Sequence, residues 1–545
     1  MKKCRDQDEL IPRIVKWAAV LWPALCVIGC GIPEVRSKPE LAALATKTRQ
    51  VERVQLTDQS KTPPVSVEQA TKEVVREVTG PNQPRPMVKL TLEEVRAAAL
   101  ANNLDLKVQL IEPSVAEQAI DIERARFESV FRASASYGTT ALPGDGSWSR
   151  RAADAGVETP LWTGGSITAN APVEEVGGVS EAAASVSVIQ SLLRGAGARI
   201  NTYAIEVAAY NKGAVDAFTK SRAIDILGGA DIAYWRLYAA RKQLDVSREQ
   251  YKMAQNQLKY AHLKVEAGSA PKTEIVYAEA GLSDGLDAVI SAETAVRNLE
   301  RDLKLIMNRA DLPLHAPVDI NTVSQPEPKG LDLDPEALIQ VALENRMDLA
   351  ELEFRLAIGD IQIARARNNL LPLLDLEYRY AADAQAGNVG GAFQDLFHHP
   401  TQDHQVGLSA TIPLGNRAAE ARLRQARLQK IQDQVSREQR EQQIRQDVYD
   451  SVENLEQSWR RILAAEQGVV RAVRTYRVRQ LQFQLGRGTD STEVLRAASS
   501  LANEQSRRIR SYADYEVAQV LLARATGTLL GRGNVQLRPA VLAGK

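Results

Sequence analysis

The chain has 545 residues, and its 68 basic and 68 acidic side chains cancel at neutral pH. Proteins that bind the phosphates of nucleic acids carry an excess or a stripe of positive charge, so this balance argues against a nucleic-acid partner. Aromatic residues make up only 5% of the chain. A composition low in aromatics and rich in Ala, Leu, Glu, Gln and Arg favours long helices over a bulky globular core.

The first 30 residues are typical of a signal peptide. Basic residues precede an apolar run over residues 17–28, which is too short to span a bilayer. All three cysteines, Cys4, Cys26 and Cys30, lie here, so no disulfide or cysteine-based metal site is expected further along. The residues before Cys30 resemble a bacterial lipobox, which would make Cys30 the lipidated first residue of the mature chain. A plain signal peptide cleaved nearby is the alternative.

Two segments of the remaining chain repeat each other at a constant offset of 243 residues, which indicates a duplicated half-protein. The identical pairs are Leu90/Leu333, Glu93/Glu336, Ala99/Ala342, Leu100/Leu343, Asn102/Asn345, Asp105/Asp348 and Leu106/Leu349. The predicted organisation is an extended Pro-rich lead segment (31–86), a first repeat (87–311), a linker (312–332), a second repeat (333–532) and a C-terminal tail (533–545).

Each repeat is predicted to begin with helices and to continue into two amphipathic strands. In the first repeat, Thr91 begins a capping-box pattern, and a second helix is expected over residues 113–127. Apolar and polar residues then alternate, which predicts strands with one wet and one apolar face. These strands cover residues 131–137 and 184–188 in the first repeat and residues 374–380 and 406–412 in the second.

The strand pattern allows two environments. A sandwich sheet in water shows this alternation, and a membrane barrel requires it. No stretch after residue 30 is apolar enough for a transmembrane helix, so a membrane crossing would have to use strands. Four strands cannot close a barrel alone, so a barrel would need several protomers. The segment 141–182 is long for one external loop, and a small additional hairpin is one interpretation of it.

Very long helices follow the strands. Residues 204–266 and 416–485 contain no proline, and as helices they would extend about 95–105 Å at about 1.5 Å per residue. Apolar residues recur at steps of three, four and seven in both, which predicts a coiled-coil seam. Each rod ends at a glycine turn, and a returning helix is expected over residues 271–308 and 489–526.

Short sequence motifs that occur in this order of elements resemble those of the TolC-type outer-membrane efflux protein family, also called outer membrane factors. One is Ala342-Leu343-Glu344-Asn345-Arg346-Met347-Asp348-Leu349, where the family usually shows ALENRPDL. Others are QSLLRG (190–195), AYW (233–235), IPLGNR (412–417) and ATGTLL (525–530). The resemblance covers residues 88 to 532.

The resemblance implies a mainly α-helical fold with a small transmembrane β part. Three protomers with four strands each would form one 12-stranded barrel in the outer-membrane lipid, and their helices would form a hollow periplasmic tunnel. It further implies a homotrimer that docks to a periplasmic adaptor (membrane fusion) protein and an inner-membrane pump. Such a duct passes small molecules outward without chemistry of its own, so we expect no enzyme activity, cofactor or metal.

The resemblance also implies where the tunnel mouth lies. Glu274 and Glu493 occupy places where the family carries acidic residues just beyond the tip turns, so three copies of each would ring the pore with carboxylates. Such a ring would bind cations and disfavour anions. The competing interpretation is that a Glu near a helix start is simply favoured by the macrodipole. Arg496 departs from the family, whose known channels carry a second acid at this place.

Three further groups of residues are candidates at the tip and in the loops. Phe483 and Arg487 could latch neighbouring helices in the closed state, or serve as a coiled-coil knob and a solvated turn residue. Gly268 and Gly486 are expected in the tip turns that meet the adaptor, with a positive φ. His398, His399 and His404 are placed in an external loop, where solvation is favoured over metal binding.

Two rival functions fit parts of the sequence. An outlet for type I protein secretion would have the same architecture, and neighbouring genes would distinguish it from small-molecule efflux. A periplasmic coiled-coil scaffold lipoprotein without a pore is the rival of another class. The amphipathic strands argue against the scaffold.

Overall fold

The computed structural model describes residues 86–142, 146–485, 488 and 490–532, together with single residues between 66 and 73. The chain divides into two units, Met1–Asn82 and Gln83–Lys545, and every element below belongs to the second. The predicted signal peptide with Cys30, most of the predicted lead segment, Gly486, Arg487 and the predicted tail 533–545 lie outside the described residues.

The two repeats begin with matching helix pairs. Helices α4 (Leu92–Asn102) and α5 (Leu104–Arg124) in the first repeat correspond to α9 (Pro335–Asn345) and α10 (Met347–Asn368) in the second, at the same offset of 243. Thr91 caps α4 through the expected capping box. Helix α5 begins nine residues before the predicted start at Pro113, because the Asn103 side chain caps it and the proline is accommodated inside the helix. The 3-10 turn Ala125–Phe127 follows α5.

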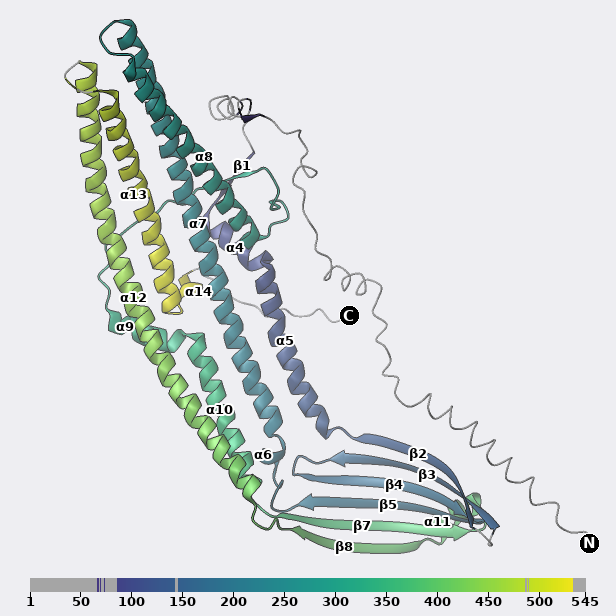
Figure 1. The fold of residues 1–545 in the computed structure, drawn as a ribbon. Helices are drawn as coiled ribbons and strands as arrows, with labels where there is room; N and C mark the ends of the chain where they lie inside the picture. Colours follow the sequence, from purple (N-terminus) through teal and green to yellow (C-terminus); the bar gives the residue numbers. More distant parts are fainter. Residues whose placement is uncertain are drawn as a thin grey trace, which may run out of the picture. The chain divides into compact units, whose positions relative to one another are not determined.

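Long helical hairpins dominate the rest of the fold (Figure 1). In what we call the first hairpin, α7 (Tyr203–Glu266, 64 residues) is followed by α8 (Thr273–Met307, 35 residues). In the second hairpin, α12 (Arg417–Gln484, 68 residues) is followed by α13 (Ser491–Ala525, 35 residues). The predicted rods and returning helices are therefore present within a few residues of their expected bounds. Short helices α6 (Ala198–Asn201) and α14 (Leu529–Arg532) flank them.

The hairpins are held by seams of buried apolar residues. Helix α12 buries Val448, Val452, Leu455, Ile462 and Val469, at the steps of three, four and seven that a coiled-coil seam requires. Helix α7 also packs along α13, which joins the two hairpins. A small parallel pair, β1 (Met87–Leu90) with β6 (Asp319–Thr322), connects the start of the first repeat to the linker.

The sheet has six strands, where the sequence predicted four. Its order is β2 (Val130–Leu142), β3 (Gly146–Pro160), β4 (Gly165–Val176), β5 (Val179–Ser191), β7 (Leu373–Ala386) and β8 (Thr401–Thr411), with every neighbouring pair antiparallel. The four expected strands are β2, β5, β7 and β8. The additional hairpin β3–β4 comes from the segment 141–182. Three copies would therefore supply 18 strands and not the expected 12.

The sequence did not reveal β3 clearly because alanine occurs on both of its faces. Ala152 and Ala153 point to opposite sides of the sheet, so the alternation that marks a strand is blurred. Alanine also has a low intrinsic preference for strands.

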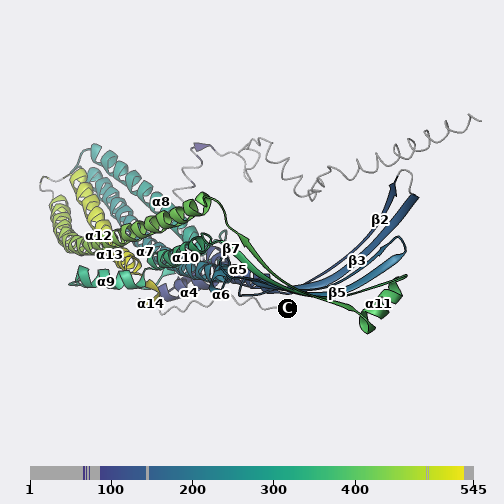
Figure 2. The ribbon, with the colours of Figure 1, turned by 90° about the horizontal axis from the view of Figure 1, so that it is seen from below.

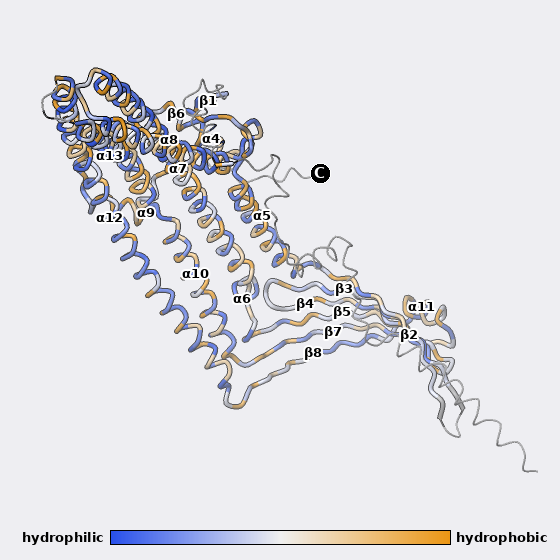
Figure 3. The backbone as a smooth tube through the Cα atoms, turned by 45° about the horizontal axis from the view of Figure 1, so that its top comes forward, coloured by the Kyte–Doolittle hydropathy of each residue, from blue (hydrophilic) through white to orange (hydrophobic). Residues whose placement is uncertain are grey.

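The six strands share one mainly apolar face, which follows from their register; Figure 3 colours the backbone of the strands by hydropathy. Paired residues of neighbouring strands point to the same face, so the register can be followed across the sheet. One such row contains Phe131, Val157, Ala169, Val186, Tyr380 and His404. We call this side the apolar face and the other the polar face. In the described part of the chain, no helix is both long and hydrophobic enough for a bilayer span.

The connection between β7 and β8 contains a helix that the sequence analysis did not predict. Helix α11 (Val389–His398) buries Ala392 and Leu396 against Ala182 and Ala384 of the sheet. Both sheet residues belong to the apolar face, because they are paired with each other in a row of that parity. Helix α11 therefore covers part of the apolar face at the end away from the long helices (Figures 1 and 2).

Candidate functional site

The first tip turn has the geometry of a glycine-ended helix. The backbone N–H of Gly268 donates to the Val265 carbonyl (3.0 Å), and that of Ser269 donates to the Lys264 carbonyl (2.9 Å). This pair of bonds is a Schellman motif, which needs a left-handed residue, and Gly268 has φ 70°. In the second tip turn Gly488 has φ 69°, while Gly486 and Arg487 lie outside the described residues.

Glu274 connects the two hairpins at this end. Its side chain is 9% exposed at the start of α8, and its Oε2 accepts a hydrogen bond of 3.0 Å from the backbone N–H of Ser491. Ser491 is the first residue of α13, whose unpaired N–H groups and macrodipole favour a carboxylate. The Ser491 hydroxyl also accepts a bond of 3.0 Å from Gln257 Nε2 on α7. In this conformation the Glu274 carboxylate is engaged inside one protomer.

Glu493 has a different environment. Its backbone N–H donates to the Asp490 side chain (2.9 Å), which caps α13. Its carboxylate forms an ion pair of 3.0 Å with Arg479 of α12, and both side chains are more than 40% exposed. Glu493 therefore binds within its own hairpin and remains accessible to solvent. Arg496, one turn further along α13, is exposed.

Phe483 also contacts the other hairpin. Its side chain is 3% exposed, and the Lys264 ammonium lies 3.4 Å from the centre of the ring. The same ammonium donates a hydrogen bond to the Phe483 carbonyl. Burial lowers the pKa of Lys264, and the nearby Glu274 charge opposes this effect. A cation over an aromatic face, partly removed from water, is an attractive contact of about 0.5–2 kcal/mol.

We call these three interactions the tip contacts: Glu274 with Ser491, Gln257 with Ser491, and Lys264 with Phe483. Sequence reasoning named Glu274 and Phe483 as site residues, and the structure places both in these contacts. It missed Lys264, Gln257 and Ser491. The partners are 217 to 234 residues apart in the chain, so no local pattern could have linked them.

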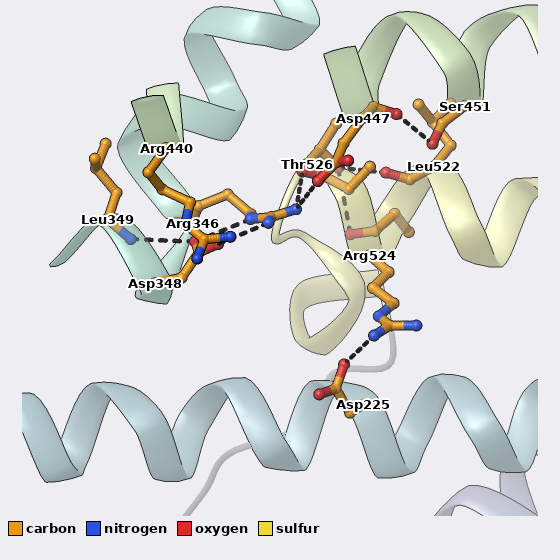
Figure 4. Close-up of polar contacts among 12 residues, drawn as sticks. Asp225, Arg346, Asp348, Leu349, Arg440, Asp447, Ser451, Leu522, Arg524 and Thr526 are labelled. Carbon is orange, nitrogen blue, oxygen red and sulfur yellow. Dashed lines mark hydrogen bonds and ion pairs between the residues drawn. The ribbon is translucent and has the colours of Figure 1, made fainter. Parts of the chain in front are cut away.

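A second polar cluster surrounds the sequence motif ALENRMDL at residues 342–349 (Figure 4). Arg346 makes two hydrogen bonds to Asp348, of 3.0 and 2.7 Å, and one of 3.2 Å to Asp447 of α12. Arg524 near the end of α13 pairs with Asp225 of α7 at 2.7 Å. These residues line a hollow of about 420 Å³. The cluster ties α10, α12, α13 and α7 together, at the start of α10 and the end of α13 and within the lengths of α7 and α12.

The charges of this cluster support one another. Burial alone would lower the pKa of Arg346, but the hydrogen bonds and charge of Asp348 raise it. Burial alone would raise the pKa of Asp348, but the bonds to Arg346 and the nearby Arg440 lower it. Both groups are therefore held in their charged forms. We interpret the Arg346–Asp348 pair as a structural element and call it the clamp. The first repeat has its own buried pair, Arg96 with Asp231 of α7 at 2.8 and 2.7 Å.

The polar face of the sheet carries more acid than base. Among the described strand residues, its acidic members are Asp154, Glu158, Glu174, Glu181, Asp375, Glu377, Asp383 and Asp403, and its basic members are Arg132, Arg150 and Arg379. A lumen lined by this face would have a negative potential that favours cations.

The three candidate histidines do not form one loop cluster. His398 ends α11 and His399 follows it, with the two rings 6.5 Å apart. His404 lies within β8, which corrects its expected place in the loop. Its ring packs beside Tyr380 with centroids 5.1 Å apart, and its Nδ1 lies 3.1 Å from the Tyr378 hydroxyl. Among the described residues, no group of three His, Cys, Asp or Glu side chains is arranged to hold a metal ion.

Comparison with known proteins gives a family match over part of the chain and a shared fold over most of it. The model of the outer membrane efflux protein family matches residues 338–528. A crystal structure of CusC, from a study of its folding and transmembrane channel formation, has 16% sequence identity to this chain. The TM-score is 0.63, and the match covers 83% of this chain and 96% of the CusC chain. The CmeC outer membrane channel of Campylobacter jejuni is 16% identical with a TM-score of 0.61, over 80% and 86%.

A third solved structure shows the same fold. The open state of the MtrE outer membrane channel of Neisseria gonorrhoeae is 17% identical with a TM-score of 0.59, over 80% of this chain and 89% of that one. A search of curated proteins finds no match. The chain therefore spans nearly the whole length of these channels, and the similarity of fold extends well beyond the matched residues 338–528.

Proposed function

Because residues 338–528 match the model of the outer membrane efflux protein family and the chain shares its fold with solved outer-membrane channels, we propose that three copies form, in the outer membrane, the exit duct of a tripartite efflux system. The duct passes small molecules outward without chemistry of its own. Its partners are a periplasmic adaptor protein and an inner-membrane pump. The duct docks to them through its tip.

The observation that carries this proposal is the single apolar face of the sheet. Large side chains on it are freely exposed in one copy: Phe131 and Tyr137 on β2 at 67% each, and Val406 and Leu408 on β8 at 73% and 66%. In water an exposed apolar face of this kind invites aggregation. Against lipid it is the required surface of a membrane strand, while the polar face lines a water-filled lumen.

The edges of the sheet support assembly of several copies. Strands β2 and β8 each have one neighbour in the chain, so each leaves a row of backbone N–H and C=O groups unpaired. Such groups cannot face hydrocarbon, where water is unavailable to satisfy them. Pairing β8 of one copy with β2 of the next removes both edges. A scaffold lipoprotein in the periplasm would leave the apolar face and both edges in water.

The gate of this duct is proposed at the tip contacts. They join the first and second hairpins of each protomer, and each hairpin ends at the proposed tunnel mouth. Separating the hairpins would break the bond from Ser491 to Glu274 and release a buried carboxylate. In the closed conformation the proposed carboxylate ring would contain only the three copies of Glu493. The three copies of Glu274 would join it when the tunnel opens.

The proposed function is tested by fractionation and conductance. We expect the full-length protein in the outer-membrane fraction as a heat-modifiable, detergent-extracted trimer, with ion-conducting events after reconstitution into planar bilayers. A soluble dimer without strand signal in circular dichroism would contradict the proposal and favour the scaffold. A trimer that never conducts, even with the tip contacts removed, would contradict the duct.

A further inference from the structure

The hairpin β3–β4 is built into the sheet from end to end, with its pairing to β5 interrupted at Ala171 and Pro172. Strand β3 pairs with β2 from Glu158 opposite Val130 to Gly146 opposite Leu142. Strand β4 pairs with β5 at both of its ends, from Gly165 opposite Gln190 to Val176 opposite Val179. The two added strands have 15 and 12 residues, which is enough for a tilted membrane strand of about 9–11 residues. A flap folded away from the sheet would show neither pairing at both ends of the strands nor matched length.

The hairpin also obeys the two-faced pattern of its neighbours. Its side chains on the apolar face include Ala153, Ala155 and Val157 of β3 and Ala169 and Val173 of β4. A strand in an external flap has water on both sides and needs no apolar face. The hairpin therefore has the side-chain pattern of a wall strand.

Charged residues of the hairpin are placed where a wall strand tolerates them. On the polar face, Glu158 pairs with Arg132 of β2 at 3.0 Å, and Arg150 pairs with Glu174 at 2.5 Å. The apolar face of the hairpin carries Arg151 and Glu175, which pair with each other at 3.4 Å. They lie towards the end of the strands away from the long helices, where a membrane strand would leave the hydrocarbon.

We propose that β3 and β4 are wall strands and that three copies close an 18-stranded barrel, with β8 of one copy paired to β2 of the next. The proposal rests on the trimeric duct proposed above. Six strands per copy keep the neighbouring strands antiparallel at this seam. The curvature of the sheet in Figure 2 agrees with a place in a closed wall.

The consequence is a wider exit. The diameter of a barrel grows about linearly with strand number, so 18 strands enclose a lumen about 1.5 times as wide as 12 strands. Barrels of about 16–18 strands leave an aqueous channel. The outer-membrane part would then not limit the size of the cargo, and size selection would fall to the tip.

The first test measures lipid exposure along the hairpin in the full-length trimer reconstituted into lipid. Single cysteines carrying a nitroxide are introduced at Ala155 and Asp154 of β3, with Ala133 and Ser134 of β2 as the matched reference and the parent chain as background. Oxygen from the lipid phase should relax labels at Ala155 and Ala133, and a water-soluble nickel chelate should relax those at Asp154 and Ser134.

Two results would separate the proposals. Water access at both Ala155 and Asp154, with alternation kept on β2, would overturn the 18-stranded wall and leave the duct intact. Loss of alternation on β2 as well would overturn the membrane barrel itself, and with it the proposed function.

The second test counts strands directly by electron microscopy of trimers in nanodiscs. The intact protein should show 18 strands, and 12 would overturn the proposal. A variant with residues 143–178 replaced by a short glycine-rich turn can still pair β2 with β5, because these two strands run in opposite directions. Its barrel should shrink to about two-thirds of the diameter, and an unchanged diameter would contradict the proposal. If the variant does not assemble, the count on the intact protein decides.

Discussion

Glu274 and Glu493 both lie in the first turn of a helix that returns from the tip, where the macrodipole favours a carboxylate. Only Glu274 is buried and reaches the other hairpin. The sequence led to both residues through the family resemblance but could not rank them. The difference between them arises from Ser491 and Lys264, which belong to distant segments. A hydrogen bond to a charged group contributes about 1.5–3 kcal/mol, so the closed conformation depends much more on Glu274.

We predict that Glu274→Ala opens the channel. Loss of about 1.5–3 kcal/mol from the closed state shifts the opening equilibrium by roughly 10- to 100-fold per protomer, because 1.4 kcal/mol corresponds to tenfold. The readout is the open probability in planar bilayers. Glu279→Ala is the matched control, since Glu279 is an exposed carboxylate on the same helix. Equal behaviour of the two variants would contradict the role of Glu274.

Block by multivalent cations should depend on Glu493 first. Because Glu493 is accessible while Glu274 is engaged, Glu493→Ala should weaken the block of the closed-tip channel. The double variant with Glu274→Ala, which is expected to be open, should weaken the block further. Titration of the bilayer current with a trivalent cation measures both effects. A block that is unchanged in the double variant would remove these residues from the pore ring.

The Arg346–Asp348 clamp gives a prediction about stability. Arg346→Ala leaves Asp348 and Asp447 without their common partner, and breaking a largely buried pair should cost about 2–4 kcal/mol. The control is Arg355→Ala on α10, the helix that follows Arg346, whose i,i+4 pair with Glu351 contributes at most about 0.5 kcal/mol. The midpoint of urea unfolding of the trimer, followed by tryptophan fluorescence, should fall clearly for the first variant alone.

The same clamp has a defined pH dependence. The pKa of Asp348 is lowered in the folded protein because the Arg346 bonds outweigh burial, so the unfolded chain binds the proton more readily. Its stabilising effect is full above the unfolded pKa of about 3.9 and is lost as pH falls through the lower folded value. Asp348→Asn should therefore flatten the acid side of the stability curve measured by the same unfolding assay.

The elements differ in how far the sequence determined them. Proline-free heptad patterns identified α7 and α12 to within two residues, because a seam of 60 residues contains many repeats of the signal. Strands β2, β5, β7 and β8 alternate clearly. Strands β3 and β4 do not, because small residues occupy both of their faces. Helix α11 was missed because its ten residues give too few turns for a periodic pattern to be distinguished from a loop.

Helix α11 makes a prediction of its own. It rests on the apolar face of the sheet while its own outer side exposes Phe397 at 79% and Phe393 at 40%, a typical arrangement for a helix at the edge of a lipid layer. Phe397→Trp should show quenching by brominated lipid above that of the parent protein. Gln394→Trp, on the same exposed helix, is the control and should show less. Equal quenching would place α11 away from lipid.

In the whole molecule, the tip contacts and the Arg346–Asp348 clamp divide the length of the helices into two parts. The polar cluster around the clamp joins α7, α10, α12 and α13 where α10 begins and α13 ends, whereas the tip contacts hold the two hairpins together where α13 begins. Opening is therefore expected as a local separation of the hairpins beyond the clamp. The proposed place of the gate comes from the family resemblance, and the structure adds that the tip contacts lie between hairpins of one protomer.

Cross-linking can test this division. Cysteines at Gln257 and Ser491, joined by a short bifunctional maleimide, should hold the hairpins together and keep the conductance low. The same reagent between cysteines at Arg479 and Glu493 stays within the second hairpin and should leave opening possible. Full opening with the first cross-link in place would show that the hairpins do not separate.

The hairpin β3–β4 starts at the C-terminal end of β2 and finishes at the same end of the sheet, where β5 begins. The chain therefore reaches α7 as if the insertion were absent. Two strands can thus be added to the first repeat without re-routing either long helix. The width of the exit and the geometry of the helical part can then change independently during evolution. Among relatives, we expect insertions between these strands to occur in even numbers of strands, because an odd number would deliver the chain to the wrong side of the membrane.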